Sequence, residues 1–209
     1  MPVDYNRIAG RNLDRIAAIS DGIFAVGMTL LVLDLKTPAQ ELIHTNGELM
    51  HTLASMSPQF FTYFISFLTL GIFWMGQQAQ LNSMAGSDRN YTWMHLGFLL
   101  GVSMLPFSTR LLSEFFLYRG ALLCYWLNIL YLGTILYLSW RYAVKATLIS
   151  PETDNALRCA IERRILIAQA LYACGAALCF IDTRISIAVI LLLQLNYVFA
   201  PKLPLISRI

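Results

Sequence analysis

Long apolar stretches alternate with short polar segments along the whole chain. The apolar stretches cover residues 16–35, 58–78, 91–112, 121–140, 165–182 and 185–200. A helix needs about 20 predominantly apolar residues to cross the hydrocarbon core of a bilayer. The pattern therefore predicts an all-α integral membrane protein, in which residues 1–209 form one domain of six transmembrane helices.

Two of the polar connections are longer than the others. Residues 38–57 contain spaced apolar side chains, which predict a short helix at the membrane surface. Ser57-Pro58 and Ser150-Pro151 each place a helix-capping residue before a proline suited to the first helical turn. We therefore expect one helix to start at Pro58, and another to start at Pro151 and continue into the fifth apolar stretch.

The composition supports a membrane location. Hydrophobic residues make up 57% of the chain and charged residues 13%, against about 25% charged residues in soluble domains. The first 14 residues have neither the apolar core nor the cleavage site of a signal peptide, so the first helix is expected to be retained. The net charge of +3 is too small to predict a nucleic-acid partner, and the lipid bilayer is the expected environment.

The distribution of Lys and Arg predicts the orientation in the membrane. If the N-terminus is cytosolic, eleven of the 15 Lys and Arg residues lie on the cytosolic side of the spans. The four on the outer side are Lys36, Arg110, Arg119 and Arg184. Cytosolic loops of membrane proteins carry an excess of Lys and Arg. We therefore expect both termini to be cytosolic.

Polar side chains interrupt the first apolar stretch and its flanks. They are Arg15, Ser20, Asp21, Thr29 and Asp34. An ionisable residue at membrane depth is costly, which makes each a candidate functional residue. We expect Asp21 to point into the helix bundle and to clamp the helices together. Its partner would be one of three donors, Gln77, Gln78 or His95, or else an arginine near the cytosolic interface. Asp34 is expected at the outer mouth, where a carboxylate attracts cations.

Two stripes run along this first helix at about 100° per residue. One consists of Gly22, Val26, Thr29, Leu30 and Leu33. The other consists of Ile23, Gly27, Leu30 and Asp34. Several copies of the first stripe around an axis would form a hydrophobic constriction, whereas the second stripe would place a carboxylate at the outer mouth. Either stripe is also consistent with ordinary helix packing. The spacing alone does not decide between them.

Motifs of other functional classes are missing from the sequence. There is no nucleophile elbow, phosphate loop or HExxH zinc motif, so we expect neither an enzyme nor a metal or cofactor site. The Thr-Val-Gly-Tyr-Gly filter of ordinary potassium channels is also absent, which excludes the tetrameric carbonyl-filter fold. His95 is either a proton-sensitive switch or a histidine hydrogen-bonded between helices.

Three short motifs resemble one family. "RIAAISDG" at Arg15–Gly22 resembles the Arg-x-x-x-Phe-Ser-Asp signature of the transmembrane protein 175 family of potassium channels, with Ile19 in place of phenylalanine. Phe73-Trp74 and Leu105–Phe107 are similar to the motifs of its second and third helices. The chain departs from the family pattern at Gln77, where histidine is usual, and at His95, where asparagine is usual.

The resemblance implies a single-repeat, prokaryotic-type subunit of a homotetramer in the inner or plasma membrane, with its first helix lining the pore. The pore constriction would consist of Val26, Leu30 and Leu33, and Thr29 would help to select potassium, the permeant ion. The signature network would consist of Arg15, Ser20, Asp21, Trp74, Gln77 and His95. Two other functions remain open: a proton-coupled secondary transporter that uses Asp21 and His95, and a non-conducting membrane scaffold.

Overall fold

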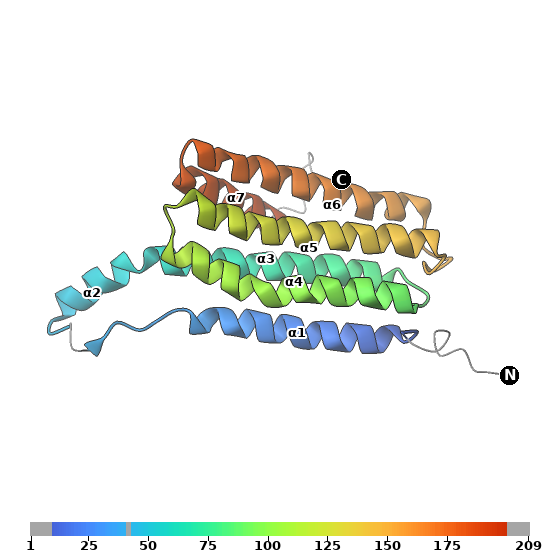
Figure 1. Ribbon diagram of the computed structural model, residues 1–209, viewed down its shortest axis with the longest axis horizontal. Coiled ribbons are helices and arrows are strands. Elements are labelled where there is room, and N and C mark those ends of the chain that lie inside the picture. Colours follow the sequence, from blue (N-terminus) through green and yellow to red (C-terminus); the bar gives the residue numbers. More distant parts are fainter. Residues whose placement is uncertain (1–9, 41–42, 200–209) are drawn as a thin grey trace.

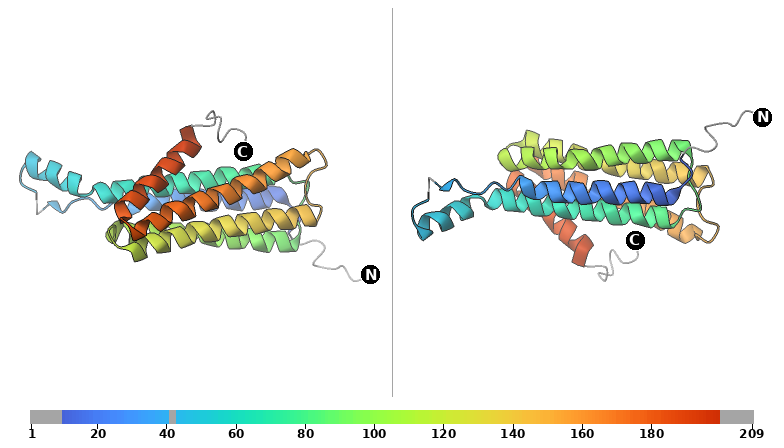
Figure 2. Two further views of the ribbon diagram at one scale, coloured as in Figure 1. Left: turned by 90° about the horizontal axis from the view of Figure 1, so that it is seen from above. Right: turned by 90° about the horizontal axis from the view of Figure 1, so that it is seen from below.

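Helices form the entire fold of residues 10–40 and 43–199, the part of the chain that the computed structural model describes (Figure 1). The α-helices are α1 (Leu13–Leu33), α2 (Asn46–Ser55), α3 (Ser57–Asn82), α4 (Arg89–Glu114), α5 (Arg119–Lys145), α6 (Asn155–Ala177) and α7 (Thr183–Phe199). A 3₁₀ turn, η3 (Leu178–Phe180), extends α6. Helices α1, α3, α4, α5 and α6 run along the bundle, whereas α7 leaves the turn after α6 at an angle to it (Figures 1 and 2).

The six predicted apolar stretches fall on α1, α3, α4, α5, α6 with η3, and α7. The first five of these helices are long and apolar enough to cross a membrane. Helix α7 has 17 residues, which corresponds to a length of about 26 Å against a hydrocarbon core of about 30 Å. The all-helical membrane fold is therefore confirmed, whereas the sixth span and the orientation of the termini remain predictions.

Two helix starts differ from the prediction. Helix α3 begins at Ser57 itself, with Met56 in the capping position and Pro58 in the first turn. Helix α6 begins at Asn155 rather than at Pro151. The reason is that the connection before α6 pairs with the connection before α4: Met84 and Ile149 form an isolated antiparallel bridge. This pairing holds the backbone before Pro151 extended.

The predicted short helix between the first two long helices is present as α2. A capping box starts it: the Thr45 side chain accepts from the Glu48 backbone, and the Glu48 carboxylate accepts from the Thr45 backbone. Helix α2 buries none of its side chains. It extends beyond one end of the bundle, next to the start of α3 (Figure 1).

The core of the bundle lies between α3, α4 and α5. Its largest cluster includes Leu70, Phe98, Leu105, Leu122 and Ile129, all almost completely buried. Helices α4 and α5 approach closely at Gly101, where a Cβ atom would lie 2.7 Å from Tyr131 Cδ1. Only glycine permits this contact without a shift of the tyrosine ring.

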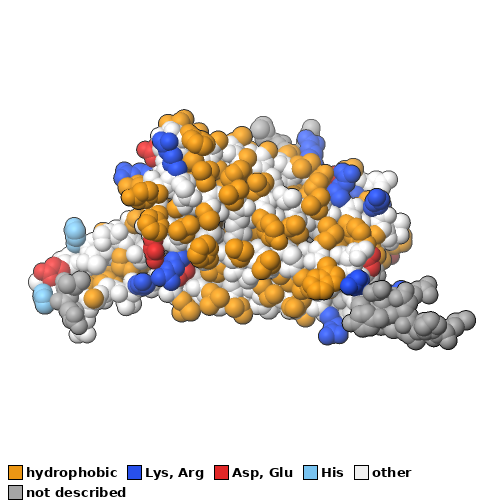
Figure 3. Space-filling view, in the orientation of Figure 1, with side chains coloured by type: hydrophobic (Ala, Val, Ile, Leu, Met, Phe, Trp, Pro, Cys, Tyr) orange, Lys and Arg blue, Asp and Glu red, His pale blue; other side chains and the backbone are white. Residues whose placement is uncertain are grey.

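The surface of the bundle is apolar over most of its length. Figure 3 shows hydrophobic side chains across the middle of the bundle and charged side chains toward its ends. Examples of exposed apolar residues are Met75, Leu100, Phe107, Leu127 and Leu192. A soluble monomer rarely exposes so large a continuous apolar surface. The distribution is that of a protein surrounded by lipid.

Candidate pore face and signature network

Helix α1 packs against α3 and α4 through one face. The side chains on this face recur every three or four residues and are Ile16, Ser20, Phe24, Gly27 and Leu31. Phe24 contacts Phe98 of α4, with ring centroids 6.0 Å apart. At Gly27 a Cβ atom would already lie 3.6 Å from Leu70 Cδ1 of α3, so a small residue allows α1 to approach α3.

A second face of α1 is left uncovered by the rest of the described chain. It consists of Gly22, Val26, Thr29, Leu30 and Leu33, all exposed, and we call it the α1 stripe. The exposed fraction is 56% for Val26 and 73% for Leu33. An open groove of about 400 Å³ lies between α1 and Ser103 of α4. It is lined by Gly22, Val26 and Leu30 of the α1 stripe, and also by the neighbouring Ile19, Ile23 and Gly27.

The structure separates the two stripes that the sequence leaves open. In the stripe that contains Gly27 and Asp34, Gly27 is buried and Ile23 and Asp34 are half-buried, while Leu30, which belongs to both stripes, is exposed. Asp34 also serves as the C-terminal capping residue of α1. The α1 stripe, in contrast, has no such internal packing role within the described residues.

Thr29 is the polar member of the α1 stripe. Its hydroxyl lies 2.8 Å from the Val26 carbonyl oxygen and 3.0 Å from that of Ala25, so it donates its proton to its own helix. A hydroxyl that donates in this way keeps its oxygen lone pairs available. Thr29 as a residue is exposed on the stripe. The arrangement presents an acceptor, the type of group that solvates a cation.

Asp21 links α1 to α3 at the edge of the stripe. Its Oδ1 atom accepts hydrogen bonds from Trp74 Nε1 at 2.8 Å and from Gln78 Nε2 at 3.0 Å. Gln78 is one of the three donors expected from the sequence, whereas Gln77 and His95 do not contact Asp21. The residue is exposed rather than directed into the bundle, because its donors sit on the side of α3 next to α1.

Ser20 and His95 form a second link, inside the bundle. Ser20 is completely buried, and its Oγ lies 2.7 Å from the Ile16 carbonyl oxygen and 2.6 Å from His95 Nε2. If the single Ser20 proton goes to the Ile16 carbonyl, His95 Nε2 carries the proton that it shares with Ser20. His95 is 3% exposed and stacks on the Tyr91 ring at 5.9 Å.

Two expected members of the signature network stand apart from these links. Arg15 is exposed, and its side chain forms no hydrogen bond or ion pair within residues 10–40 and 43–199. Gln77 is 1% exposed, and neither polar atom of its amide has a partner among the described residues. Of the expected signature network, the structure therefore shows two hydrogen-bonded pairs, Asp21 with Trp74 and Ser20 with His95. Arg15 and Gln77 belong to neither pair.

Sequence reasoning missed a buried polar cluster between α3, α4, α5 and α7. Its centre is the Tyr125 hydroxyl, 2.9 Å from Thr69 Oγ1 and 3.3 Å from Ser66 Oγ. Thr109 donates to Ser66 at 2.7 Å, and Gln194 Nε2 donates to Thr69 at 2.7 Å. The spacing of Ser66 and Thr69, one turn apart in an apolar helix, is the sequence signal for such a cluster.

Metal binding receives no support from the described residues. They contain no group of three or more His, Cys, Asp or Glu side chains placed to hold a metal ion. The four cysteines are free thiols. The candidate site thus consists of an exposed apolar stripe with one hydroxyl, anchored to the bundle by two polar links.

This combination of a lipid-compatible helical bundle and an uncovered apolar helix face defines a multi-pass membrane protein. Residues 15–106 match the sequence profile of the family described as "Endosomal/lysosomal potassium channel TMEM175". A potassium channel of Chamaesiphon minutus is 29% identical over 187 residues, covering 88% of this chain and 92% of that protein. The "endosomal/lysosomal proton channel TMEM175" of Mus musculus is 27% identical over 220 residues, covering 95% of this chain and 42% of that protein.

A solved structure agrees with the sequence relatives. The crystal structure of a lysosomal potassium-selective channel TMEM175 homolog from Chamaesiphon minutus superposes with a TM-score of 0.79. The two chains are 25% identical, and the match covers 91% of this chain and 98% of that one. These matches together support membership of the TMEM175 family, whose members are ion channels and not enzymes.

Proposed function

We propose that this chain is the subunit of a potassium-permeable cation channel in the cell membrane, with α1 lining the pore. The observation that carries the proposal is the α1 stripe: a continuous apolar face, left uncovered, on a helix whose opposite side is packed and polar-anchored. The potassium channel of Chamaesiphon minutus, which matches over most of both chains, supports potassium as the permeant ion.

A homotetramer with both termini cytosolic completes the proposal. One stripe cannot enclose a pathway, whereas four copies around an axis form a pore narrow enough to exclude water from an apolar stretch. The tetramer itself comes from the family resemblance. Six spans, with α7 as the last, return the chain to the side on which it starts, consistent with the excess of Lys and Arg there.

In this proposal the stripe acts as both gate and selectivity element. Rings of Val26, Leu30 and Leu33 exclude water when they are close together, which blocks ions without a charged barrier. The Thr29 ring supplies hydroxyl oxygens to an ion that has lost part of its hydration shell. Asp34, at the outer end of α1, concentrates cations at the mouth. Asp21 and Ser20 hold α1 against the bundle so that the ring keeps its diameter.

Single-channel recording of purified protein in a bilayer tests the proposal. Val26→Ala is expected to raise potassium conductance or open probability at least about tenfold, equivalent to about 1.4 kcal/mol in the barrier. Val32→Ala is the matched control, because Val32 lies on α1 and is exposed but is outside the stripe. Equal effects of both substitutions, or no effect of either, would remove α1 from the pore wall.

A second candidate function, proton movement, is favoured by the buried Ser20–His95 pair. The mouse relative is named a proton channel, and a histidine is the side chain that most readily exchanges protons near neutral pH. A proton-coupled transporter predicts saturable flux driven by a pH gradient, without single-channel currents, that is lost in His95→Gln. A scaffold predicts no ion flux at all. The same bilayer recording, made with potassium and then with a pH gradient, distinguishes the three functions.

A further inference from the structure

The start of α6 forms a basic surface that the mechanism of the α1 stripe does not use. Helix α6 buries only Tyr172, Gly175 and Ala176, all in its last turns, so residues 155–171 have no buried side chain. Helix α7 diverges from α6 over this same region and leaves the side of α6 open (Figure 2). Arg163 and Arg164 lie on this open part and are both exposed.

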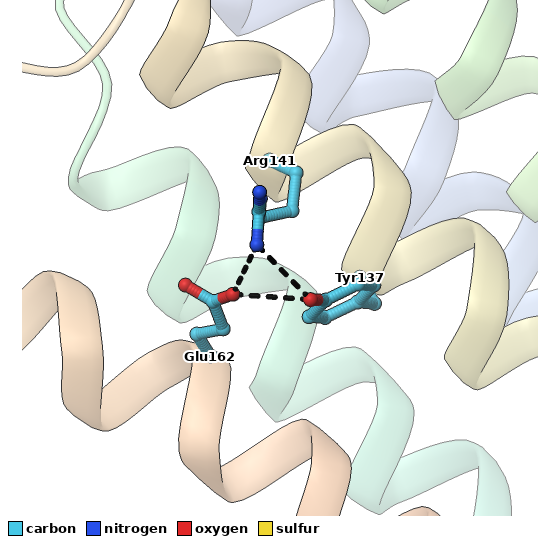
Figure 4. A network of polar contacts seen from close by, with 3 residues as sticks. All are labelled: Tyr137, Arg141 and Glu162. Carbon is cyan, nitrogen blue, oxygen red and sulfur yellow. Dashed lines mark hydrogen bonds and ion pairs between the residues drawn. The ribbon is translucent and has the colours of Figure 1, made fainter.

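An ion pair between α5 and α6 indicates where these arginines lie along the membrane normal. Arg141 donates to Glu162 at 2.9 Å and to the Tyr137 hydroxyl at 3.3 Å, and Tyr137 donates to Glu162 at 3.1 Å (Figure 4). Arg141 directly follows the apolar stretch 121–140 of α5. The residues after Glu162 therefore lie level with the end of that stretch, where the phosphate groups of a lipid leaflet are expected.

Arg163 and Arg164 have no acidic partner in the described part of the chain. The ion pairs there are Arg110–Glu114 and Arg141–Glu162. Arg164 instead places its guanidinium 5.8 Å from the centre of the Tyr197 ring of α7. A guanidinium that rests on an aromatic face keeps its N–H groups free for an anion. Leu166, which lies three residues after Arg163 and so on the same side of α6 as Arg163, is 49% exposed and offers an apolar surface.

We propose that this surface, defined by Arg163, Arg164, Tyr197 and Leu166, binds an anionic phospholipid of the cytosolic leaflet. The phosphate accepts hydrogen bonds from the guanidinium groups, which match phosphate geometry, and an acyl chain lies along Leu166. The cytosolic leaflet carries anionic lipids that attract basic segments beside membrane spans. The inference rests on the cytosolic orientation of the termini in the proposed function, and it does not require ion conduction.

The experiment compares lipid binding in two double variants of the full chain. In nanodiscs of phosphatidylcholine with or without phosphatidylglycerol, anionic lipid is expected to raise the thermal midpoint of the unmodified protein. Arg163→Gln with Arg164→Gln is expected to weaken phosphatidylglycerol binding about fivefold per arginine, measured by native mass spectrometry. Arg119→Gln with Arg184→Gln, which removes two exposed arginines at the other end of the bundle, is expected to leave binding unchanged.

Several results would overturn the inference. They are unchanged binding in the Arg163/Arg164 glutamine variant, an equal loss in the control variant, and an equal stabilisation by inorganic phosphate. Arg163→Lys with Arg164→Lys preserves both charges but removes the paired guanidinium hydrogen bonds, so an intermediate loss of binding is expected. A loss as large as in the glutamine variant would contradict a contribution of the positive charge to lipid binding. Labelling of exposed Cys159 from one side of the membrane tests the orientation separately.

Discussion

The two faces of α1 differ in what covers them. One face, from Ile16 to Leu31, packs against α3 and α4 and is almost completely buried. The α1 stripe lies on the same 21-residue helix and is left exposed. Both faces are largely apolar, so hydrophobicity alone does not distinguish a packing face from a pore face. The distinction comes from where the neighbouring helices lie.

The hydroxyl groups of the two faces show the same contrast. Ser20, on the packed face, is bonded to another helix through His95. Thr29, on the α1 stripe, is bonded only to its own helix. A polar group shared between helices stabilises their arrangement, whereas one satisfied within its helix is free to meet a permeant species. We therefore expect the packed face to control folding and the stripe to control conduction.

The largest expected effect on folding comes from Phe24 on the packed face. Phe24 is 1% exposed and contacts Phe98, so Phe24→Ala leaves a cavity and is expected to cost about 3–5 kcal/mol of stability. Val26→Ala, two residues away, is expected to change stability by less than about 0.5 kcal/mol. Reversible unfolding in mixed detergent micelles measures both. A destabilisation by Val26→Ala as large as that by Phe24→Ala would contradict the division between the faces.

The second-largest expected loss of stability comes from Asp21, which lies between the two faces of α1. Asp21→Ala removes the carboxylate that accepts hydrogen bonds from Trp74 and Gln78. Because hydrogen bonds to charged groups contribute about 1.5–3 kcal/mol, the free energy of unfolding is expected to fall by about 2 kcal/mol. Asp21→Asn keeps an acceptor oxygen and is expected to cost about half as much. Unfolding of the two variants under the same conditions measures the difference. Equal stability of the alanine variant and the unmodified protein would show that Asp21 does not clamp α1 to α3.

More of the fold than of the candidate site could be predicted from the sequence, and particular residues show why. Stretch length is enough to locate spanning helices, because a bilayer demands about 20 apolar residues. The start of α6 was misplaced because Ser150 hydrogen-bonds to the Ser83 carbonyl at 2.9 Å, a contact between segments distant in sequence. Local capping rules do not include such contacts.

The sequence predicts that polar side chains link α1 to the bundle, but it does not predict which residues pair. The sequence indicates that Asp21 needs a donor, and Gln78 was one of three expected donors, but Trp74 was expected only through the family resemblance. The choice between donors depends on the rotation of α3 relative to α1, which no local pattern specifies. The same rotation brings His95 to Ser20 rather than to Asp21. Likewise, the two stripes of α1 could be separated only once the positions of α3 and α4 were known.

The smallest stability effect, and the sharpest test of the two faces, compares their hydroxyl groups. Ser20→Ala removes the partner of a buried histidine and is expected to cost about 1–2 kcal/mol, since an unpaired buried polar group carries a desolvation penalty. Thr29→Ala removes a hydroxyl that is bonded only within α1 and is exposed, so its expected cost is below about 0.5 kcal/mol.

Recordings of the same two variants should show the reverse order for ion selectivity. Thr29→Ala is expected to lower the potassium-to-sodium permeability ratio, because the ring loses the hydroxyl oxygens that replace part of the hydration shell. Ser20→Ala is expected to keep that ratio, since Ser20 is buried away from the stripe. Val32→Ala again serves as the control on α1. If Ser20→Ala changed selectivity while Thr29→Ala left it intact, conduction would depend on the packed face, and the exposed stripe would be a contact surface for lipid or another subunit.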